Sequence, residues 1–156
     1  MRKTKPKYFN VMWLLVIAIL FSSSCKDDDE VEPILEERVY AMQPVSDPDI
    51  SGTIVFSKQN ETTTLVTITL VGTTAGDMHP AHIHGNSAEM GGPIVIDLNS
   101  VDGATGQSET LVSQLDNGTP ITYEGLLAFD GHANVHLSPT QMATLIAQGN
   151  IGANSP

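Results

Sequence analysis

The strongest constraint on the fold is a period of two in short β-branched segments. TTTLVTITLVG (62–72) sets Leu65, Ile68 and Leu70 among five threonines. Successive side chains of a strand point to opposite faces, so such segments predict strands with one buried face. Comparable runs are RVYAMQP (38–44), GTIVFSK (52–58), GPIVIDL (92–98), SETLVSQL (108–115), PITYEGLLAF (120–129), HANVHL (132–137) and AQGNIGA (147–153).

Turn-forming residues punctuate these runs, as in SDPDISG (46–52) and at Asn117–Gly118. About eight short strands at regular spacing predict an all-β domain, an antiparallel Greek-key β-sandwich or barrel. One short helix is expected near the C-terminus, in SPTQMATLI (138–146). Ser138 can cap it, Pro139 suits its first position, and Met142 and Ile146 share a face.

The N-terminus has the organisation of a secretory signal peptide. Four basic residues precede the apolar run VMWLLVIAILF, which is followed by SSSC. At eleven residues the run is shorter than the roughly 20 that a membrane span needs. We expect residues 1–24 to be the signal peptide.

Cys25, the only cysteine, stands where a bacterial lipoprotein is cleaved and acylated, as by palmitate. The upstream motif is loose, because the usual branched aliphatic residue three positions before it is missing. A soluble secreted protein with a free thiol is the alternative. The acidic tract at Asp27–Glu30 resembles the export signal of some surface lipoproteins, or is a solvated spacer. Residues 25–37 are expected to form a lipidated tether at the outer membrane, on its periplasmic or its cell-surface side, and residues 38–156 the folded domain.

Charge restricts the partners. The whole chain has a formal net charge of −11, with 18 acidic and 7 basic residues. Removing residues 1–24 takes away four basic residues and no acidic one, so the mature chain has a formal charge of −15. Nucleic acid and anionic lipid are therefore not expected as partners, because both require basic patches.

All five histidines fall in two clusters, HPAHIH (79–84) and HANVH (132–136). Strand alternation places His82 and His84 on one face, and His132, Asn134 and His136 on one face of the other strand. If the two strands approach each other, up to four imidazoles converge, and neutral imidazole suits copper and zinc. The alternative is a hydrogen-bonded histidine scaffold without a metal.

The segments AHIHG (81–85), GGPIVIDL (91–98) and GLLAFDGHANVHLSP (125–139) resemble the CHRD domain, a module found in many bacterial secreted proteins. The resemblance covers about Gly52 to Asn154. The terminal motif of the family is present only as GNIGAN (149–154), without its acid and its arginine. The resemblance implies a β-sandwich and no settled activity.

A more distant resemblance is to copper/zinc superoxide dismutase. It implies copper ligands at His82, His84 and His136, with His79 in a structural role. We expect water or His132 to complete the site at a fourth position. The zinc ligands, the bridging histidine, the disulfide and the guiding arginine of that family are missing. Dismutation therefore fits poorly.

We expect a non-catalytic envelope domain that binds an extracellular protein or glycan. The clustered histidines would bind copper or zinc, with His79 and Asn134 supporting them. A copper-dependent redox or metal-handling protein is the alternative function.

Overall fold

The computed structural model describes residues 36–155, which form eight strands and one short helix. The predicted signal peptide, Cys25 and the acidic tract lie outside the described residues. The elements are β1 (Glu37–Pro44), β2 (Ser51–Lys58), β3 (Thr64–Val71), β4 (Met78–Gly85), β5 (Ile94–Asp102), β6 (Gln107–Val112), α1 (Tyr123–Leu127), β7 (Asp130–His136) and β8 (Leu145–Gly152).

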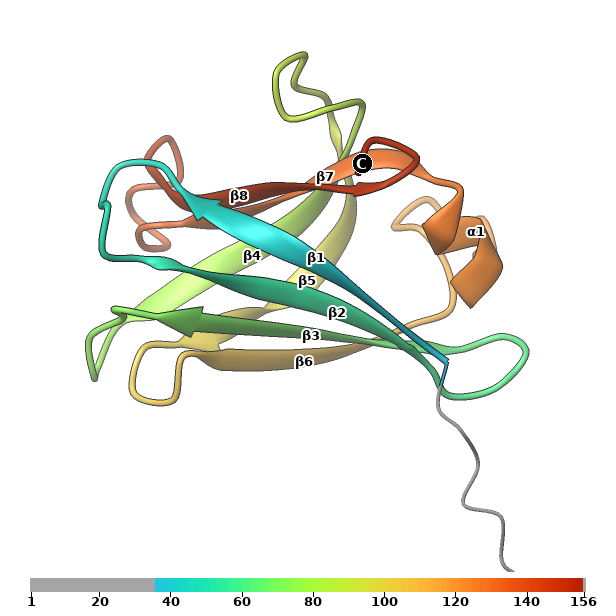
Figure 1. Cartoon of the computed structure of the whole chain (residues 1–156), viewed down its shortest axis with the longest axis horizontal. Helices are drawn as coiled ribbons and strands as arrows, with labels where there is room; N and C mark the ends of the chain where they lie inside the picture. Colours follow the sequence, from blue (N-terminus) through green and yellow to red (C-terminus); the bar gives the residue numbers. More distant parts are fainter. Residues whose placement is uncertain (1–35, 156) are drawn as a thin grey trace, which may run out of the picture. The chain divides into compact units, whose positions relative to one another are not determined.

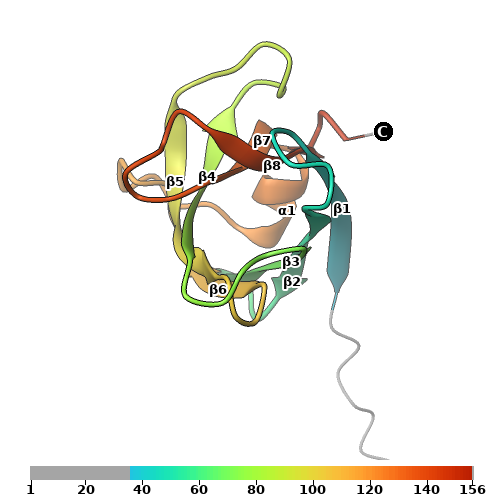
Figure 2. The same ribbon diagram turned by 90° about the vertical axis from the view of Figure 1, so that its left-hand side faces the viewer.

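The strands close into an antiparallel barrel in the order β1-β2-β3-β6-β5-β4-β7-β8 (Figures 1 and 2). The chain crosses over twice, from β3 to β4 and from β6 to β7, which is a Greek-key arrangement. The predicted all-β Greek-key class is confirmed. Through the second crossover β7 lies beside β4, although 44 residues separate the end of one from the start of the other.

Alternating side chains fill the barrel. In β3, Val66, Ile68 and Leu70 point inward, while Leu65 lies on the outer face. The interior of the barrel is aliphatic with few aromatic rings, and Tyr40 and Phe56 meet edge to face with ring centroids 5.2 Å apart. Figure 1 shows α1 at one end of the strands, where Tyr123 and Leu126 join the core.

The helix is not where it was expected. PITYEGLLAF was predicted as a strand, but Tyr123–Leu127 forms α1, with the Thr122 hydroxyl capping it by accepting from the Gly125 amide at 3.2 Å. The two buried residues of α1, Tyr123 and Leu126, are three apart, a helical spacing. The apolar residues of the segment also fit the alternation of a strand, and the strand prediction was based on that pattern.

The segment predicted as a helix, SPTQMATLI, forms turns and the start of a strand. Gln141 donates to the Ser138 carbonyl at 3.0 Å, and Thr144 donates to the Gln141 carbonyl at 3.1 Å. Leu145 and Ile146 belong to β8, where cross-strand pairing and burial prevail over local helix propensity. No helix among residues 36–155 is long and apolar enough to cross a membrane.

The barrel wall is weakest between β5 and β6. Their only backbone pair is Asp102 with Gln107, at the hairpin that joins them. Farther along, side chains replace the ladder: the Asn99 side-chain amide donates to the Glu109 carbonyl at 2.6 Å, and the Thr110 hydroxyl accepts from the Asn99 amide at 2.9 Å. One side of this seam is β5, whose other edge pairs with β4, the strand that contains His82 and His84.

Candidate metal centre

The two histidine clusters lie on adjacent strands, β4 and β7, and His82, His84, His132 and His136 face away from the barrel interior. Ala81 and Ile83 alternate with the histidines of β4 and are fully buried in the core. In β7, Ala133 and Val135 occupy the corresponding inward positions. The predicted alternation therefore holds in both strands, and the hydrophobic core takes the opposite face from the histidines.

Strand register brings the imidazoles together. His82 is paired with Asn134 and His84 with His132, so His136 lies diagonally from His82. The candidate ligand atoms of His82, His84 and His136 all lie within 4.8 Å of one another. Nε2 of His136 is 3.1 Å from Nδ1 of His82. The structure thus gathers three of the four predicted ligands in one cluster.

Two loops cover this outer face and orient its rings. In the loop between β4 and β5, the Gly92 carbonyl accepts from Nδ1 of His84 at 2.9 Å, and the Asn86 carbonyl accepts from Nδ1 of His132 at 2.8 Å. In the loop between β7 and β8, the Leu137 carbonyl accepts from Nδ1 of His79 at 2.9 Å. These bonds leave Nε2 of His84 facing the cluster, buried and without a hydrogen-bond partner.

The loop between β4 and β5 has an unusual backbone. Asn86 has a φ of 64°, a left-handed conformation that asparagine tolerates better than most residues. A Cβ atom on Gly92 would lie 2.0 Å from the Gly85 carbonyl oxygen, so only glycine permits this approach. The close approach places the Gly92 carbonyl against His84.

The remaining predicted site residues lie close by. His132 is buried and stacks on His84, with ring centroids 5.0 Å apart and planes inclined by 20°. It is not in the group of three whose ligand atoms converge, and its role as a fourth ligand stays a prediction. Asn134 is buried, and its side-chain oxygen accepts from Gln148 at 2.8 Å. His79 is buried and bonded to the loop after β7, and its supporting role stays a prediction.

Burial favours the neutral form of two histidines of the cluster, His82 and His136. Desolvation lowers the pKa of His82, and His84 adds to this, while the carboxylates of Asp97 and Asp116 act in the opposite direction. Desolvation also lowers the pKa of His136, opposed by the Met142 backbone carbonyl and reinforced by His82 and His84. Neutral imidazole is the form that binds metal ions.

A carboxylate that the sequence reasoning missed stands beside the cluster. Asp97 in β5 is paired with His82, and its Oδ1 lies 3.7 Å from Nε2 of His82. One signal was present in the sequence, because Asp97 is the single charged residue in the aliphatic run GPIVIDL. The covering carbonyls of Asn86, Gly92 and Leu137 had no such signal, since every residue has a carbonyl.

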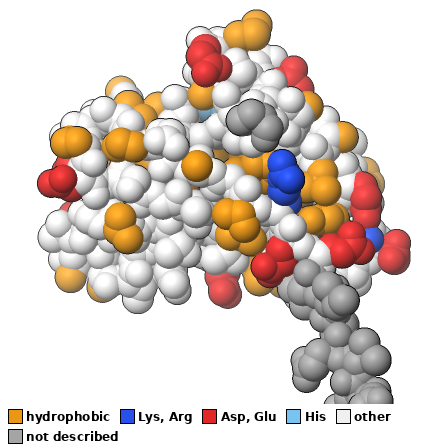
Figure 3. Space-filling view, viewed as in Figure 1, with side chains coloured by type: hydrophobic (Ala, Val, Ile, Leu, Met, Phe, Trp, Pro, Cys, Tyr) orange, Lys and Arg blue, Asp and Glu red, His pale blue; other side chains and the backbone are white. Residues whose placement is uncertain are grey.

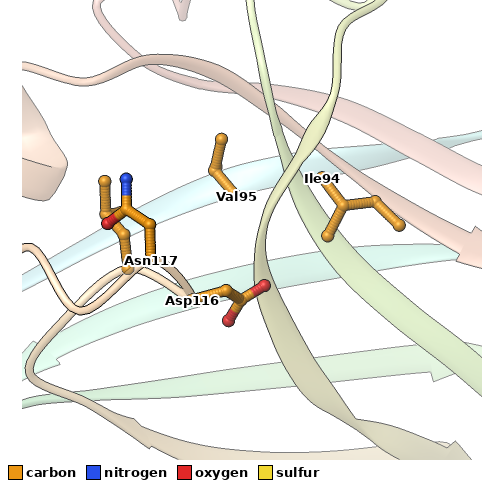
Figure 4. Close-up of a pocket in the computed structure, with 5 residues that line it drawn as sticks. Ile94, Val95, Asp116 and Asn117 are labelled. Carbon is orange, nitrogen blue, oxygen red and sulfur yellow. The ribbon is translucent and has the colours of Figure 1, made fainter.

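A pocket of about 320 Å³ lies beside β5. Ile94 and Val95 of β5 line it together with Leu115, Asp116 and Asn117 from the loop after β6 (Figure 4). None of these lining residues is a histidine, so the pocket is separate from the histidine cluster. Its link to the centre is Asp116, whose carboxylate oxygens accept from the Asp97 amide at 3.1 and 3.2 Å.

Basic side chains are scarce on the described part of the chain. Arg38 and Lys58 are its only lysine or arginine residues, and Figure 3 shows little blue on the face in view. Arg38 lies on β1 and Lys58 on β2, and neither strand pairs with β4 or β7. Lys58 is also engaged by Glu124 at 2.6 Å. The histidine cluster therefore has no nearby cation on its own strands to attract an anionic substrate.

Comparison with known families agrees with the resemblance noted from AHIHG and HANVH. The family model for the CHRD domain matches residues 21–154. The chain belongs to the CHRD domain family. The match extends N-terminally beyond the range that the motifs indicated and contains all five histidines. Comparisons with curated proteins and with solved structures gave no significant match.

Proposed function

We propose that this CHRD domain binds one copper or zinc ion through His82, His84 and His136, as a non-catalytic component of the cell envelope. The observation that carries the proposal is the convergence of three imidazoles within 4.8 Å. All five histidines of the chain lie in the two strands that form this cluster. The metal-free alternative is a scaffold in which each ring nitrogen has a hydrogen-bond partner.

Three buried ring nitrogens have no hydrogen-bond partner, which is not expected of a pure scaffold: Nε2 of His79, Nε2 of His84 and Nδ1 of His136. Nε2 of His84 is buried without a partner, whereas Nδ1 of the same ring is bonded to Gly92. Leaving a buried polar nitrogen unpaired costs about 1–3 kcal/mol, and a metal ion would remove that cost. Three neutral imidazoles suit copper and zinc, and a bound ion would supply Lewis acidity or, for copper, one-electron chemistry.

The charge distribution favours binding over turnover of an anion. Arg38 and Lys58 lie on strands that do not pair with β4 or β7, and the mature chain is strongly acidic. Such a surface attracts cations and repels anions such as superoxide. A metal-handling role uses the same three histidines and differs only in whether the ion is passed on.

Zinc titration of the purified full chain, produced without a metal-affinity tag, tests the site. We expect one Zn(II) per chain, and a loss of at least about tenfold in affinity for His84→Ala and for His136→Ala. His132→Phe, which removes an imidazole but keeps an aromatic ring against His84, then tests whether His132 is a fourth ligand. Unchanged affinity in His84→Ala and His136→Ala would contradict the proposed site, as would the absence of zinc binding by the unmodified chain.

Attachment to the outer membrane through a lipid on Cys25 is a separate part of the proposal. It is supported by the order of basic residues, apolar run and SSSC at the N-terminus. Cys25→Ala is expected to abolish incorporation of labelled palmitate and to release the protein from membranes. A Cys25→Ala protein that stays membrane-bound with unchanged mobility would exclude lipidation. At the envelope, an extracellular protein or glycan is the expected partner class.

A further inference from the structure

The two ring nitrogens of His82 face different chemical groups. Nδ1 lies 3.1 Å from Nε2 of His136, and Nε2 lies 3.7 Å from a carboxylate oxygen of Asp97. The first contact joins two imidazoles within the cluster. The second reaches across to β5, where Asp97 is the register partner of His82. The position of the proton on this ring therefore decides which contact is satisfied.

Without a metal, the proton of His82 belongs on Nδ1. Two ring nitrogens 3.1 Å apart form a hydrogen bond only if one of them carries the proton. The Met142 carbonyl raises the pKa of His136, and we infer that the proton of that ring is on Nδ1. Nδ1 of His136 is buried and makes no hydrogen bond, so it does not compete for the proton shared with His82. Nε2 of His136 then has a free lone pair, and Nδ1 of His82 is the donor.

A metal bound by the cluster requires the opposite tautomer. The cluster-facing nitrogens are then Nδ1 of His82 and Nε2 of His84 and His136, and all three must present lone pairs. A neutral His82 carries its proton on Nε2, the nitrogen that faces Asp97. On metal binding the ring gives up the proton on Nδ1 to solvent and takes up a proton on Nε2, so it stays neutral.

We propose that Asp97 is a positioning residue that stabilises the metal-binding tautomer of His82. The inference rests on the proposed metal-binding function. A carboxylate that accepts the outer N–H of a ligating histidine fixes the ring orientation and raises the basicity of the ligand. Asp97 is the acidic residue paired with a histidine of the cluster in the β4–β5 register.

The surroundings of Asp97 fit this role. Its backbone is held by the Asp116 carboxylate, and the Asp116 amide donates to the Val95 carbonyl at 3.0 Å. Its side chain is 74% exposed and therefore free to change rotamer. A charge-assisted N–H···O bond is about 2.7–2.9 Å long, so a shift of roughly 1 Å from the observed separation suffices.

Two measurements test the inference. The first is the tautomer of His82, from long-range ¹⁵N–¹H NMR spectra of the full chain with and without Zn(II). We expect the proton on Nδ1 without zinc and on Nε2 with zinc. The second is zinc affinity in Asp97→Asn, expected to fall about 10–100-fold. Asp97→Glu, which keeps the carboxylate, should retain most of the affinity, and Glu61→Gln controls for the loss of one negative charge.

The outcomes separate this inference from the proposed function. If the unmodified chain binds no zinc, the proposed function fails, and with it the basis of the inference. If it binds zinc but Asp97→Asn binds equally well, the metal site stands and the role of Asp97 is wrong. A proton that remains on Nδ1 of His82 in the zinc-bound chain also overturns the inference, independently of any variant.

Discussion

His84 and His132 face each other across the β4–β7 pair with their rings stacked, the centroids 5.0 Å apart. The stacking gives His132 a packing role whether or not it binds a metal. We expect His132→Ala to leave a cavity beside His84 and to lower the free energy of unfolding by about 2–4 kcal/mol. His132→Phe keeps the ring and loses the bond to the Asn86 carbonyl, so its cost should be about 1 kcal/mol. Urea unfolding measures both, and equal costs would show that stacking contributes nothing.

The Gly92 carbonyl orients His84, and glycine is required at this position. In Gly92→Ala the new methyl group would meet the Gly85 carbonyl oxygen at 2.0 Å, so the loop must move. We expect weaker zinc binding together with a lower melting temperature. Gly85→Ala is the matched control, because the nearest atom to its Cβ lies 4.0 Å away. Zinc affinity that falls equally in both variants would mean that the loop does not position His84.

Acid should destabilise the metal-free protein through the buried histidines. The pKa values of His82 and His136 are lowered in the folded state, chiefly by burial. Unfolded chains therefore take up protons first. The contribution of these neutral histidines to the free energy of unfolding is complete above about pH 6.5, the ordinary pKa of histidine. It is lost as the pH falls toward the lower pKa values of the folded state. Melting temperatures of the unmodified chain and of His136→Gln across this range measure the effect, and parallel profiles would contradict it.

Metal affinity should follow the same protonation. Because burial lowers the pKa of two of the three proposed ligands, protons should compete with zinc at His82 and His136 only at pH values below the ordinary range of histidine. Competition titrations with a zinc chelator between pH 5 and 8, values spanning roughly the titration range of histidine, measure this. A decline that begins well above about pH 6.5 would show that the ligands are not held neutral by burial.

The acidic tract should act on localisation and leave the fold unchanged. Replacing it by Asp27→Asn, Asp28→Asn, Asp29→Asn and Glu30→Gln removes four charges that directly follow Lys26. We expect surface protease accessibility in whole cells to fall, with an unchanged melting temperature, because an acidic tether buries no apolar surface. Accessibility equal to that of the unmodified protein would leave the tract as a spacer.

The strands and the faces of the histidines could be predicted because strand alternation is a local property. Ala81 and Ile83 alternate with His82 and His84 in the sequence, and the same alternation separates core from site in the structure. The motif HANVH obeys the same rule. That the two strands lie side by side was inferred from the resemblance to superoxide dismutase, because a Greek-key crossover is not encoded by any one segment.

The features that could not be predicted depend on tertiary contacts. The helix at Tyr123–Leu127 was mistaken for a strand because five residues give little periodicity to distinguish the two. The pairing of His82 with Asp97 depends on the β4–β5 register, which is irregular between His79 and Ala81 and again between Ile83 and His84. No sequence pattern specifies such shifts. The number of short helices in the described chain was right, and the position was wrong.

The separation of core and histidines on opposite faces of β4 and β7 has a practical consequence for engineering. Ala133 and Val135 stabilise the barrel from within, and the rings that would hold a metal are attached to the outside of the same strands. Changes of donor type at the outward positions would leave the inner packing intact. The domain is therefore a scaffold on which new ligand sets for other ions can be installed and compared, with the unaltered barrel as a constant background.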